Sequence, residues 1–189
     1  MRSSGSTHSP RSDRPVALWL LVAGEDHPKA CTGRRLLRRR LALPLSPERA
    51  PRYPPLLLDP HADVPLGPAD REVAVAGGIL GIDCSWNRLA ERGGYPEGAR
   101  WLRKLRTRRR LPWLIAANPQ HFGRLGELNT AEAFAAALSL VGEPKRATAL
   151  IGAFPGGTTF LEINRSRFEA YCAARTEADL RAAEVGLFG

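Results

Sequence analysis

The chain has few cysteines and no long apolar run, and each absence narrows what it can be. Its three cysteines, Cys31, Cys84 and Cys172, are isolated, with neither CxxC pairing nor the Cys/His spacing of a metal site. We therefore expect no disulfide framework, no zinc or other metal, and a reducing, cytoplasmic location. No apolar stretch approaches the roughly 20 residues that a membrane-spanning helix needs, so we expect no membrane partner.

The sequence also lacks the motifs of several common enzyme classes. It contains no GxGxxG, no Walker loop, no HExxH and no serine-nucleophile elbow. These absences argue against a conventional dinucleotide enzyme, a P-loop phosphotransferase, a zinc protease and a serine hydrolase.

Acidic residues are in the minority. The 189 residues include 28 Lys and Arg against 19 Asp and Glu, a formal net charge of +9. Such an excess predicts a polyanionic partner, most naturally a nucleic acid. The charge gathers in two arginine-rich runs, either of which could instead be a solvated face. We expect RNA contacts from Arg34, Arg35, Arg38, Arg103, Lys104, Arg106, Arg108, Arg109 and Arg110.

Apolar stretches alternate with helix-like stretches, which predicts an α/β fold. A strand is expected over residues 16–22, and a helix follows with Leu36 and Leu37 on its apolar face. Residues 43–70 are proline-rich and predict at most a short edge strand at 56–59. We place a domain junction near Pro68 and read residues 1–14, rich in Ser, Arg and Pro, as a disordered basic arm.

The stretch from Gly77 to Trp86 combines an apolar, glycine-rich run with polar residues at its end. An apolar run over residues 73–75 and 79–82, broken by glycines where another backbone or a ligand could come close, predicts a buried strand that ends in the polar tetrad Asp83-Cys84-Ser85-Trp86. Open α/β sheets build ligand sites at the carboxyl ends of their strands. The alternative is a core strand followed by a helix that Asp83 or Ser85 caps.

Two further polar loops follow apolar stretches. Thr32 is placed to cap the helix that begins near it, and Asn129 and Glu132 have capping-box spacing before a helix over residues 131–141. Loops of this kind converge at one edge of a sheet. Trp86 would offer a flat face to a sulfonium cation, and Asp83 a carboxylate that serves an amino group or acts as a base.

Five motifs in series carry a resemblance to a known family. They resemble, in matching order over most of residues 16–172, the archaeal and eukaryotic small-subunit ribosomal RNA aminocarboxypropyltransferases. The motifs are HPKACTGRRL (27–36), DCSW (83–86), LPWLIAANP (111–119), LNTAEA (128–133) and TFLEIN (159–164).

The resemblance implies a fold and a reaction. The fold is a small N-terminal α/β domain (residues 15–70) followed by a SPOUT-like domain (71–189) that binds S-adenosylmethionine and carries a trefoil knot. The reaction is transfer of the 3-amino-3-carboxypropyl group to N3 of a (methyl)pseudouridine in small-subunit rRNA during ribosome biogenesis. Methylthioadenosine is the by-product. We expect a monomer.

The resemblance also implies roles for individual residues. Asp83 and Trp86 would be catalytic, with the methyl group of the co-substrate packed against Trp86. The co-substrate would be bound at Thr32, Ile82, Leu111, Gly126 and Thr130, where Thr130 meets its carboxylate. This sequence departs from the family's pattern at Gly126, which is often larger, and at His121, Phe122 and Leu125.

Two alternatives stay open at this point. A knotted RNA methyltransferase would use the same co-substrate but expose its methyl carbon, leaving S-adenosylhomocysteine. A non-catalytic assembly factor would bind rRNA through the two arginine runs without measurable affinity for S-adenosylmethionine.

Overall fold

The structure is a computed structural model that describes residues 14–22, 31–46, 51–83, 95 and 99–188. The predicted arm at residues 1–14 therefore lies outside the described residues except for the exposed Arg14. The elements in chain order are β1 (Leu18–Val22), α1 (Thr32–Arg38), β2 (Leu43–Pro44), β3 (Leu56–Leu58), η1 (Pro68–Asp70), α2 (Arg71–Gly77), β4 (Ile79–Asp83), η2 (Arg100–Lys104), β5 (Arg108–Arg109), α4 (Thr130–Leu140), α5 (Pro144–Ile151), α6 (Gly157–Ile163), α7 (Arg165–Ala173) and α8 (Glu177–Phe188).

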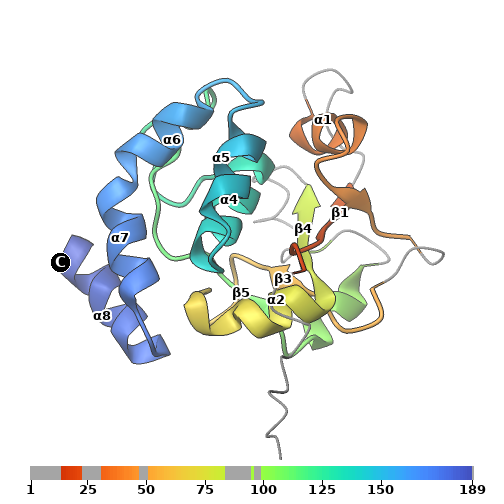
Figure 1. The fold of residues 1–189 in the computed structure, drawn as a ribbon, viewed down its shortest axis with the longest axis horizontal. Coiled ribbons are helices and arrows are strands. Elements are labelled where there is room, and N and C mark those ends of the chain that lie inside the picture. Colours follow the sequence, from red (N-terminus) through yellow and green to blue (C-terminus); the bar gives the residue numbers. More distant parts are fainter. Residues whose placement is uncertain (1–13, 23–30, 47–50, 84–94, 96–98, 189) are drawn as a thin grey trace, which may run out of the picture.

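Five parallel strands form one sheet in the order β2-β1-β4-β3-β5 (Figure 1). The central strand β4 pairs along its whole length with β1, from Leu18 opposite Ile79 to Val22 opposite Asp83. Because the strands are parallel, their carboxyl ends meet at one edge. The α/β class is confirmed, and Asp83 lies at that edge in the middle of the sheet.

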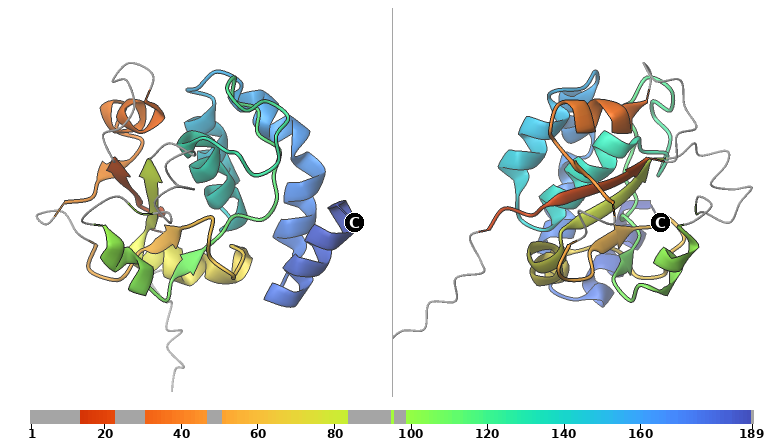
Figure 2. Two further views of the ribbon diagram at one scale, coloured as in Figure 1. Left: turned by 180° about the vertical axis from the view of Figure 1, so that it is seen from behind. Right: turned by 90° about the vertical axis from the view of Figure 1, so that its right-hand side faces the viewer.

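Side chains alternate between the two faces of the sheet. Leu56 and Ile79 belong to the main core with the helices, whereas their neighbours Leu57 and Leu80 pack on the other face against Leu102 and adjoining residues. The segment around η2 therefore covers one face, and helix α4 covers the other (Figure 2). The same alternation turns the Asp83 side chain toward α1 and α4.

Helix α4 is the centre of the main core. Nine of its eleven residues are buried, because the sheet lies on one side and α5 and α7 pack against it from others. Helices α6, α7 and α8 follow one another on the side away from the sheet (Figure 1). At Gly81 of β4 an added Cβ would lie 2.8 Å from the ring of Phe134, so the absent side chain lets α4 approach the sheet.

Two expectations about strands need correction. Strand β3 lies between β4 and β5 and is not an edge strand. The run at 73–75 is part of helix α2, so the central strand begins at Ile79. Gly77 and Gly78 at the end of that helix allow close approach to protein rather than ligand: an added Cβ on Gly77 would lie 2.2 Å from the carbonyl oxygen of Pro54.

The apolar segment 114–117, whose composition would suit a buried strand, does not join the sheet. The side chain of Asn164, which is fully buried, accepts a hydrogen bond from the amide of Ile115 at 2.8 Å and donates one to its carbonyl at 2.8 Å. Ile115 also forms an antiparallel bridge with Leu125. A side-chain amide thus replaces a neighbouring strand as the partner of this backbone.

The predicted boundary at residue 70 runs through a shared sheet. Strands β1, β2 and β3 come from the N-terminal side of it, and β4 and β5 come from the C-terminal side. The boundary remains a prediction about the sequence. No helix in the described part of the chain is long and apolar enough to cross a membrane.

Candidate functional site

The carboxylate of Asp83 joins three of the predicted loops. Its Oδ2 accepts hydrogen bonds from the thiol of Cys31 at 2.8 Å and from the amide of Gly33 at 3.2 Å. Its Oδ1 accepts one from the hydroxyl of Thr130. The end of β4, the start of α1 and the start of α4 therefore meet at one side chain, which is only 7% exposed.

The start of α1 differs from expectation in its cap. Cys31, and not Thr32, is the N-cap residue, and its sulfur accepts a hydrogen bond from the amide of Arg34 at 3.4 Å. Thr32 is the first residue of the helix and is half-buried. The next residue is Gly33, and a Cβ at this position would clash with the Asp83 carboxylate at 2.4 Å. Helix α1 can approach Asp83 only with a glycine at this position.

The start of α4 has the expected capping box. Asn129 accepts from the amide of Glu132 at 2.9 Å, and Glu132 accepts from the amide of Asn129 at 2.9 Å. The Glu132 carboxylate, which is 2% exposed, also accepts from the amide of Ala117 and from the side chain of Asn118. Glu132 thus holds the end of the 111–118 segment against the helix that carries Thr130.

The loop before α4 contains Gly126 in a left-handed conformation with φ +77. A Cβ added there would lie 2.9 Å from the ring of Trp113, so that ring covers the position where the family often has a larger residue. His121 binds the carboxylate of Glu127 within the same loop. Leu111 is half-buried against the main core.

The predicted site residues therefore fall into two groups. Thr32, Ile82, Asp83 and Thr130 lie together around the Asp83 carboxylate or next to it in sequence. Leu111 and Gly126 lie in the two segments that the antiparallel Ile115–Leu125 bridge joins, and Glu132 of α4 accepts from the amide of Ala117 in the first of these segments. Trp86 lies outside the described residues.

Two residues of this site, Cys31 and Glu132, received no functional role from the sequence. Cys31 directly precedes Thr32 in the same motif. Because cysteine is not among the preferred N-cap residues, the sequence predicted Thr32 as the cap. Glu132 was identified only as the partner of a cap. Its two further hydrogen bonds, from the amide of Ala117 and the side chain of Asn118, depend on the fold and have no local signal.

The predicted RNA-binding residues separate by their surroundings. The side chains of Arg34, Arg38, Arg103, Lys104 and Arg106 are exposed, and Arg35 lies over the ring of Phe154. Each of the other three forms an ion pair with a carboxylate of the protein.

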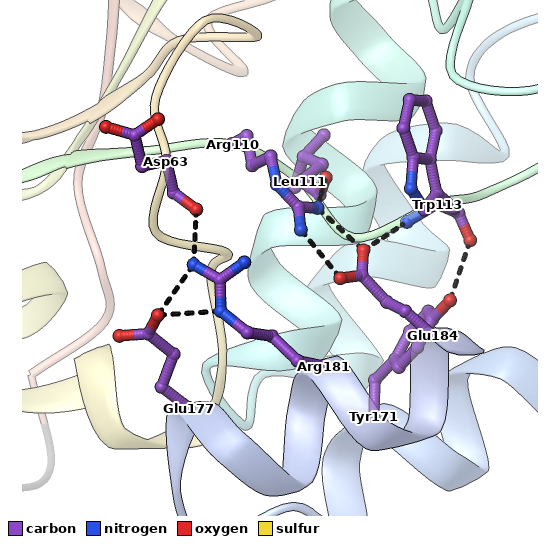
Figure 3. A network of polar contacts seen from close by, with 8 residues as sticks. All are labelled: Asp63, Arg110, Leu111, Trp113, Tyr171, Glu177, Arg181 and Glu184. Atoms are coloured by element: carbon purple, nitrogen blue, oxygen red, sulfur yellow. Dashed lines mark hydrogen bonds and ion pairs between the residues drawn. The ribbon is translucent and has the colours of Figure 1, made fainter. Parts of the chain in front are cut away.

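Arg108 binds Asp59, Arg109 binds Asp70 and Arg110 binds Glu184. The last pair is bidentate, at 2.6 Å for both nitrogens, and the same carboxylate accepts from the amide of Trp113 (Figure 3). These hydrogen bonds hold the pKa of Arg110 above its ordinary value. RNA binding by Arg108, Arg109 and Arg110 stays a prediction, although each already binds a carboxylate of the protein.

Metal chemistry finds no support in the described ranges. No group of three or more His, Cys, Asp and Glu side chains is placed there to hold a metal ion. The site instead offers a carboxylate, a hydroxyl and a helix N-terminus, which suit an organic ligand with both an amino and a carboxylate group.

Comparison with known proteins agrees with the motif pattern. The model of the family "Ribosome biogenesis protein, C-terminal" matches residues 56–187. A 16S rRNA aminocarboxypropyltransferase of Methanosarcina acetivorans is 41% identical over 174 residues, which are 91% of this chain and 94% of that protein. An 18S rRNA aminocarboxypropyltransferase of Schizosaccharomyces pombe is 33% identical over 95% of this chain and 59% of its own length.

A solved structure is also similar. The SAM-dependent rRNA:acp-transferase Tsr3 from Vulcanisaeta distributa superposes with a TM-score of 0.73 at 30% identity, covering 90% of this chain and 97% of that one. Identity of this extent over nearly the whole length establishes kinship in sequence as well as fold. The chain belongs to the family of small-subunit rRNA aminocarboxypropyltransferases.

Proposed function

We propose that this chain transfers the 3-amino-3-carboxypropyl group of S-adenosylmethionine to small-subunit rRNA and releases methylthioadenosine. The observation that carries the proposal is the 41% identity, over nearly the full length of both chains, with a protein named for this activity. The site supports it, because Asp83 brings together the loops that hold the family's motifs. The acceptor we propose is N3 of a (methyl)pseudouridine.

The choice of the transferred group is a matter of geometry. A sulfonium ion has three carbon substituents, and a nucleophile displaces sulfur from the carbon that it reaches in line. Packing the methyl group against Trp86 while the γ-carbon of the aminocarboxypropyl chain faces the RNA selects the product. The bond from N3 to the γ-carbon forms as the γ-carbon–sulfur bond breaks. The electron pair of the broken bond stays on sulfur.

The described residues fit the two ends of such a co-substrate. The amides at the start of the eleven-residue helix α4 suit the carboxylate, since the helix dipole favours an anion there. Thr32 and Ile82 flank Asp83 and are proposed to bind near the ribose. Leu111 and Gly126 lie on the two bridged segments that are proposed to hold the adenine. The ring of Trp113 fills the space beside Gly126.

The proposed RNA surface comprises the exposed cations of two segments. Arg34 and Arg38 lie on α1, and Arg103, Lys104 and Arg106 lie on or directly after η2. Exposed guanidinium and ammonium groups bind phosphates and release counterions, which makes RNA affinity depend on salt.

The trefoil knot, the division at residue 70, the monomeric state and cytoplasmic action are parts of the same proposal. The position of the 111–117 segment supports the knot. On one side Ala117 is bound to Glu132 of α4, and on the other Trp113 is bound to Tyr171 of α7 and Glu184 of α8. A threaded segment would be enclosed by helices from both sides in this way.

The proposal is tested by the nucleoside by-product. The protein is incubated with S-adenosylmethionine and unmodified small-subunit rRNA, and the products are identified by mass spectrometry. We expect methylthioadenosine together with an RNA mass increase that corresponds to the aminocarboxypropyl group. S-adenosylhomocysteine would identify a methyltransferase instead, and neither product would refute the proposed activity.

A further inference from the structure

The hydrogen bonds of Asp83 bear on its role in the reaction. We propose that Asp83 is a positioning residue and not the base that removes the N3 proton, an inference that rests on the proposed function. It fixes Thr130 and the Cys31–Gly33 turn to one another, and so fixes the two helix starts between which the co-substrate is proposed to bind.

The first argument is the number of acceptor sites. A carboxylate has about four lone-pair sites and no proton to donate. Three of them are taken by the thiol of Cys31, the amide of Gly33 and the hydroxyl of Thr130. A general base must come within hydrogen-bond reach of the proton that it removes. Asp83 is only 7% exposed, so little of its remaining capacity is open to a nucleobase.

The second argument concerns the proton of Thr130. Its hydroxyl has one hydrogen, and that hydrogen is donated to Asp83. Toward a ligand the oxygen can then act only as an acceptor. It suits the α-ammonium group of S-adenosylmethionine, while the carboxylate is left to the backbone amides of α4. Asp83 thus sets the direction in which Thr130 recognises the co-substrate.

The third argument is how α1 is attached. The thiol of Cys31 donates to Asp83 and its sulfur accepts from the amide of Arg34, so one side chain both caps the helix and binds it to β4. The close approach at Gly33 fixes the same contact sterically. Hydrogen bonds from two helix starts to one carboxylate make their separation insensitive to loop motion.

The assignment leaves the proton balance complete. N3 of the uracil ring bonds to the γ-carbon, the γ-carbon–sulfur pair goes to sulfur, and the N3 proton passes to water. Asp83 gains no proton during the step, so its removal should not change the form of the pH–rate profile.

The test compares Asp83→Asn with Asp83→Ala, and Thr130→Ser with Thr130→Val. The dissociation constant for S-adenosylmethionine alone is measured by calorimetry, and kcat and KM for methylthioadenosine release are measured against pH with an rRNA fragment. An asparagine can still accept the hydrogen of Thr130 through its side-chain oxygen, which keeps the direction of that hydroxyl. Thermal melting of each variant checks the fold.

We expect Asp83→Ala and Thr130→Val each to weaken S-adenosylmethionine binding roughly tenfold to a hundredfold, since each leaves buried partners unsatisfied. Asp83→Asn and Thr130→Ser should recover most of that loss. The pH dependence of kcat for Asp83→Asn should keep the wild-type form. An analogue of S-adenosylmethionine without the α-amino group should lose less affinity on Thr130→Val than S-adenosylmethionine does, because it never made the contact to the Thr130 oxygen.

The opposite pattern would overturn the inference. A general base contributes about 10²–10⁴ to the rate. If Asp83→Asn binds S-adenosylmethionine as wild type does but loses kcat on that scale with a changed pH profile, Asp83 is the base. Equal affinity of Thr130→Val and wild type for S-adenosylmethionine would remove the link through Thr130.

Cys31→Ser and Cys31→Ala provide a second pair if the Asp83 variants fail to fold. Serine keeps both hydrogen bonds and alanine keeps neither, so only alanine should weaken binding. Failure of the proposed function would look different: wild type would release no methylthioadenosine, while the affinities of the variants would still report on the Asp83 contacts.

Discussion

Two halves of one basic segment behave in opposite ways. Arg103, Lys104 and Arg106 belong to or follow η2 and are exposed, whereas Arg108, Arg109 and Arg110 each bind a carboxylate. The side chains of the three acids, Asp59, Asp70 and Glu184, are 3%, 11% and 8% exposed. In the sequence the two halves are a single run of like charge.

The difference follows from where β5 lies. As the edge strand next to β3 it brings its arginines beside acids from three distant parts of the chain, the end of β3, η1 and α8. A carboxylate removed from water must be paired, because an unpaired buried charge costs several kcal/mol. We infer that the paired half stabilises the fold and that the exposed half remains for RNA.

The largest expected effect is on Arg110. Arg110→Ala removes both guanidinium donors from the buried carboxylate of Glu184 while the amide of Trp113 still donates to it, and should lower the free energy of unfolding by about 3 kcal/mol. The measurement is urea denaturation followed by circular dichroism. Arg106→Ala is the matched control, and an exposed site of this kind should change stability by less than about 0.5 kcal/mol.

Equal stability of the two variants would contradict the division into a structural and an exposed half. Arg110→Lys sharpens the test. Lysine keeps the charge but cannot reproduce the bidentate contact (Figure 3), so its stability should fall between wild type and Arg110→Ala.

Arg108 should show the next largest effect. Its Nε donates to Asp59 at 2.6 Å, and the hydroxyl of Tyr95 and the amide of His61 donate to the same carboxylate. Because two donors remain, Arg108→Gln should cost about 2 kcal/mol of unfolding free energy, less than Arg110→Ala. Chemical denaturation of both variants under one set of conditions checks the order, and the reverse order would show that the partners of Asp59 do not compensate.

The exposed half should affect RNA binding and not stability. Replacing Arg34, Arg38, Lys104 and Arg106 together with Gln should reduce the slope of log affinity against log salt by about 3, at roughly 0.7 for each phosphate contact with single-stranded RNA. Titration of an rRNA fragment at several salt concentrations measures the slope. An unaltered slope, with the same melting temperature, would mean that these cations do not face RNA.

Local signals in the sequence were reliable in this chain. The capping box of Asn129 and Glu132 formed as predicted, and Thr176 and Asp179 make the same reciprocal bonds before α8. Both need only residues three apart. The α/β class also followed from the alternation of elements, and the predicted convergence of the polar loops brings Thr130 to Asp83.

Contacts between distant residues could not be predicted in the same way. Arg110 and Glu184 are separated by 74 positions, and neither residue differs locally from a surface charge. Asn164 looks like the end of a helix, yet its amide completes the backbone pairing of Ile115. The occupation of the space at Gly126 by Trp113 likewise depends on a bridge between two loop segments.

The smallest expected effect concerns Tyr171, which donates to the carbonyl of Trp113 at 3.0 Å next to the Arg110–Glu184 pair (Figure 3). Burial, and then the charge of Glu184, raises its pKa to about 12. An unfolded tyrosine titrates near pH 10, so its contribution to stability is complete below about pH 10 and is lost as pH rises toward 12.

Tyr171→Phe should therefore be less stable than wild type by about 1 kcal/mol at neutral pH, because one hydrogen bond is lost. The deficit should shrink as pH rises above about 10, since wild type then loses a contribution that the variant never had. Urea denaturation of both proteins across this range measures the difference. A stability deficit that stays constant with pH would mean that the pKa of Tyr171 is not raised in the folded protein. Burial and the charge of Glu184 would then not act on Tyr171 as the structure indicates.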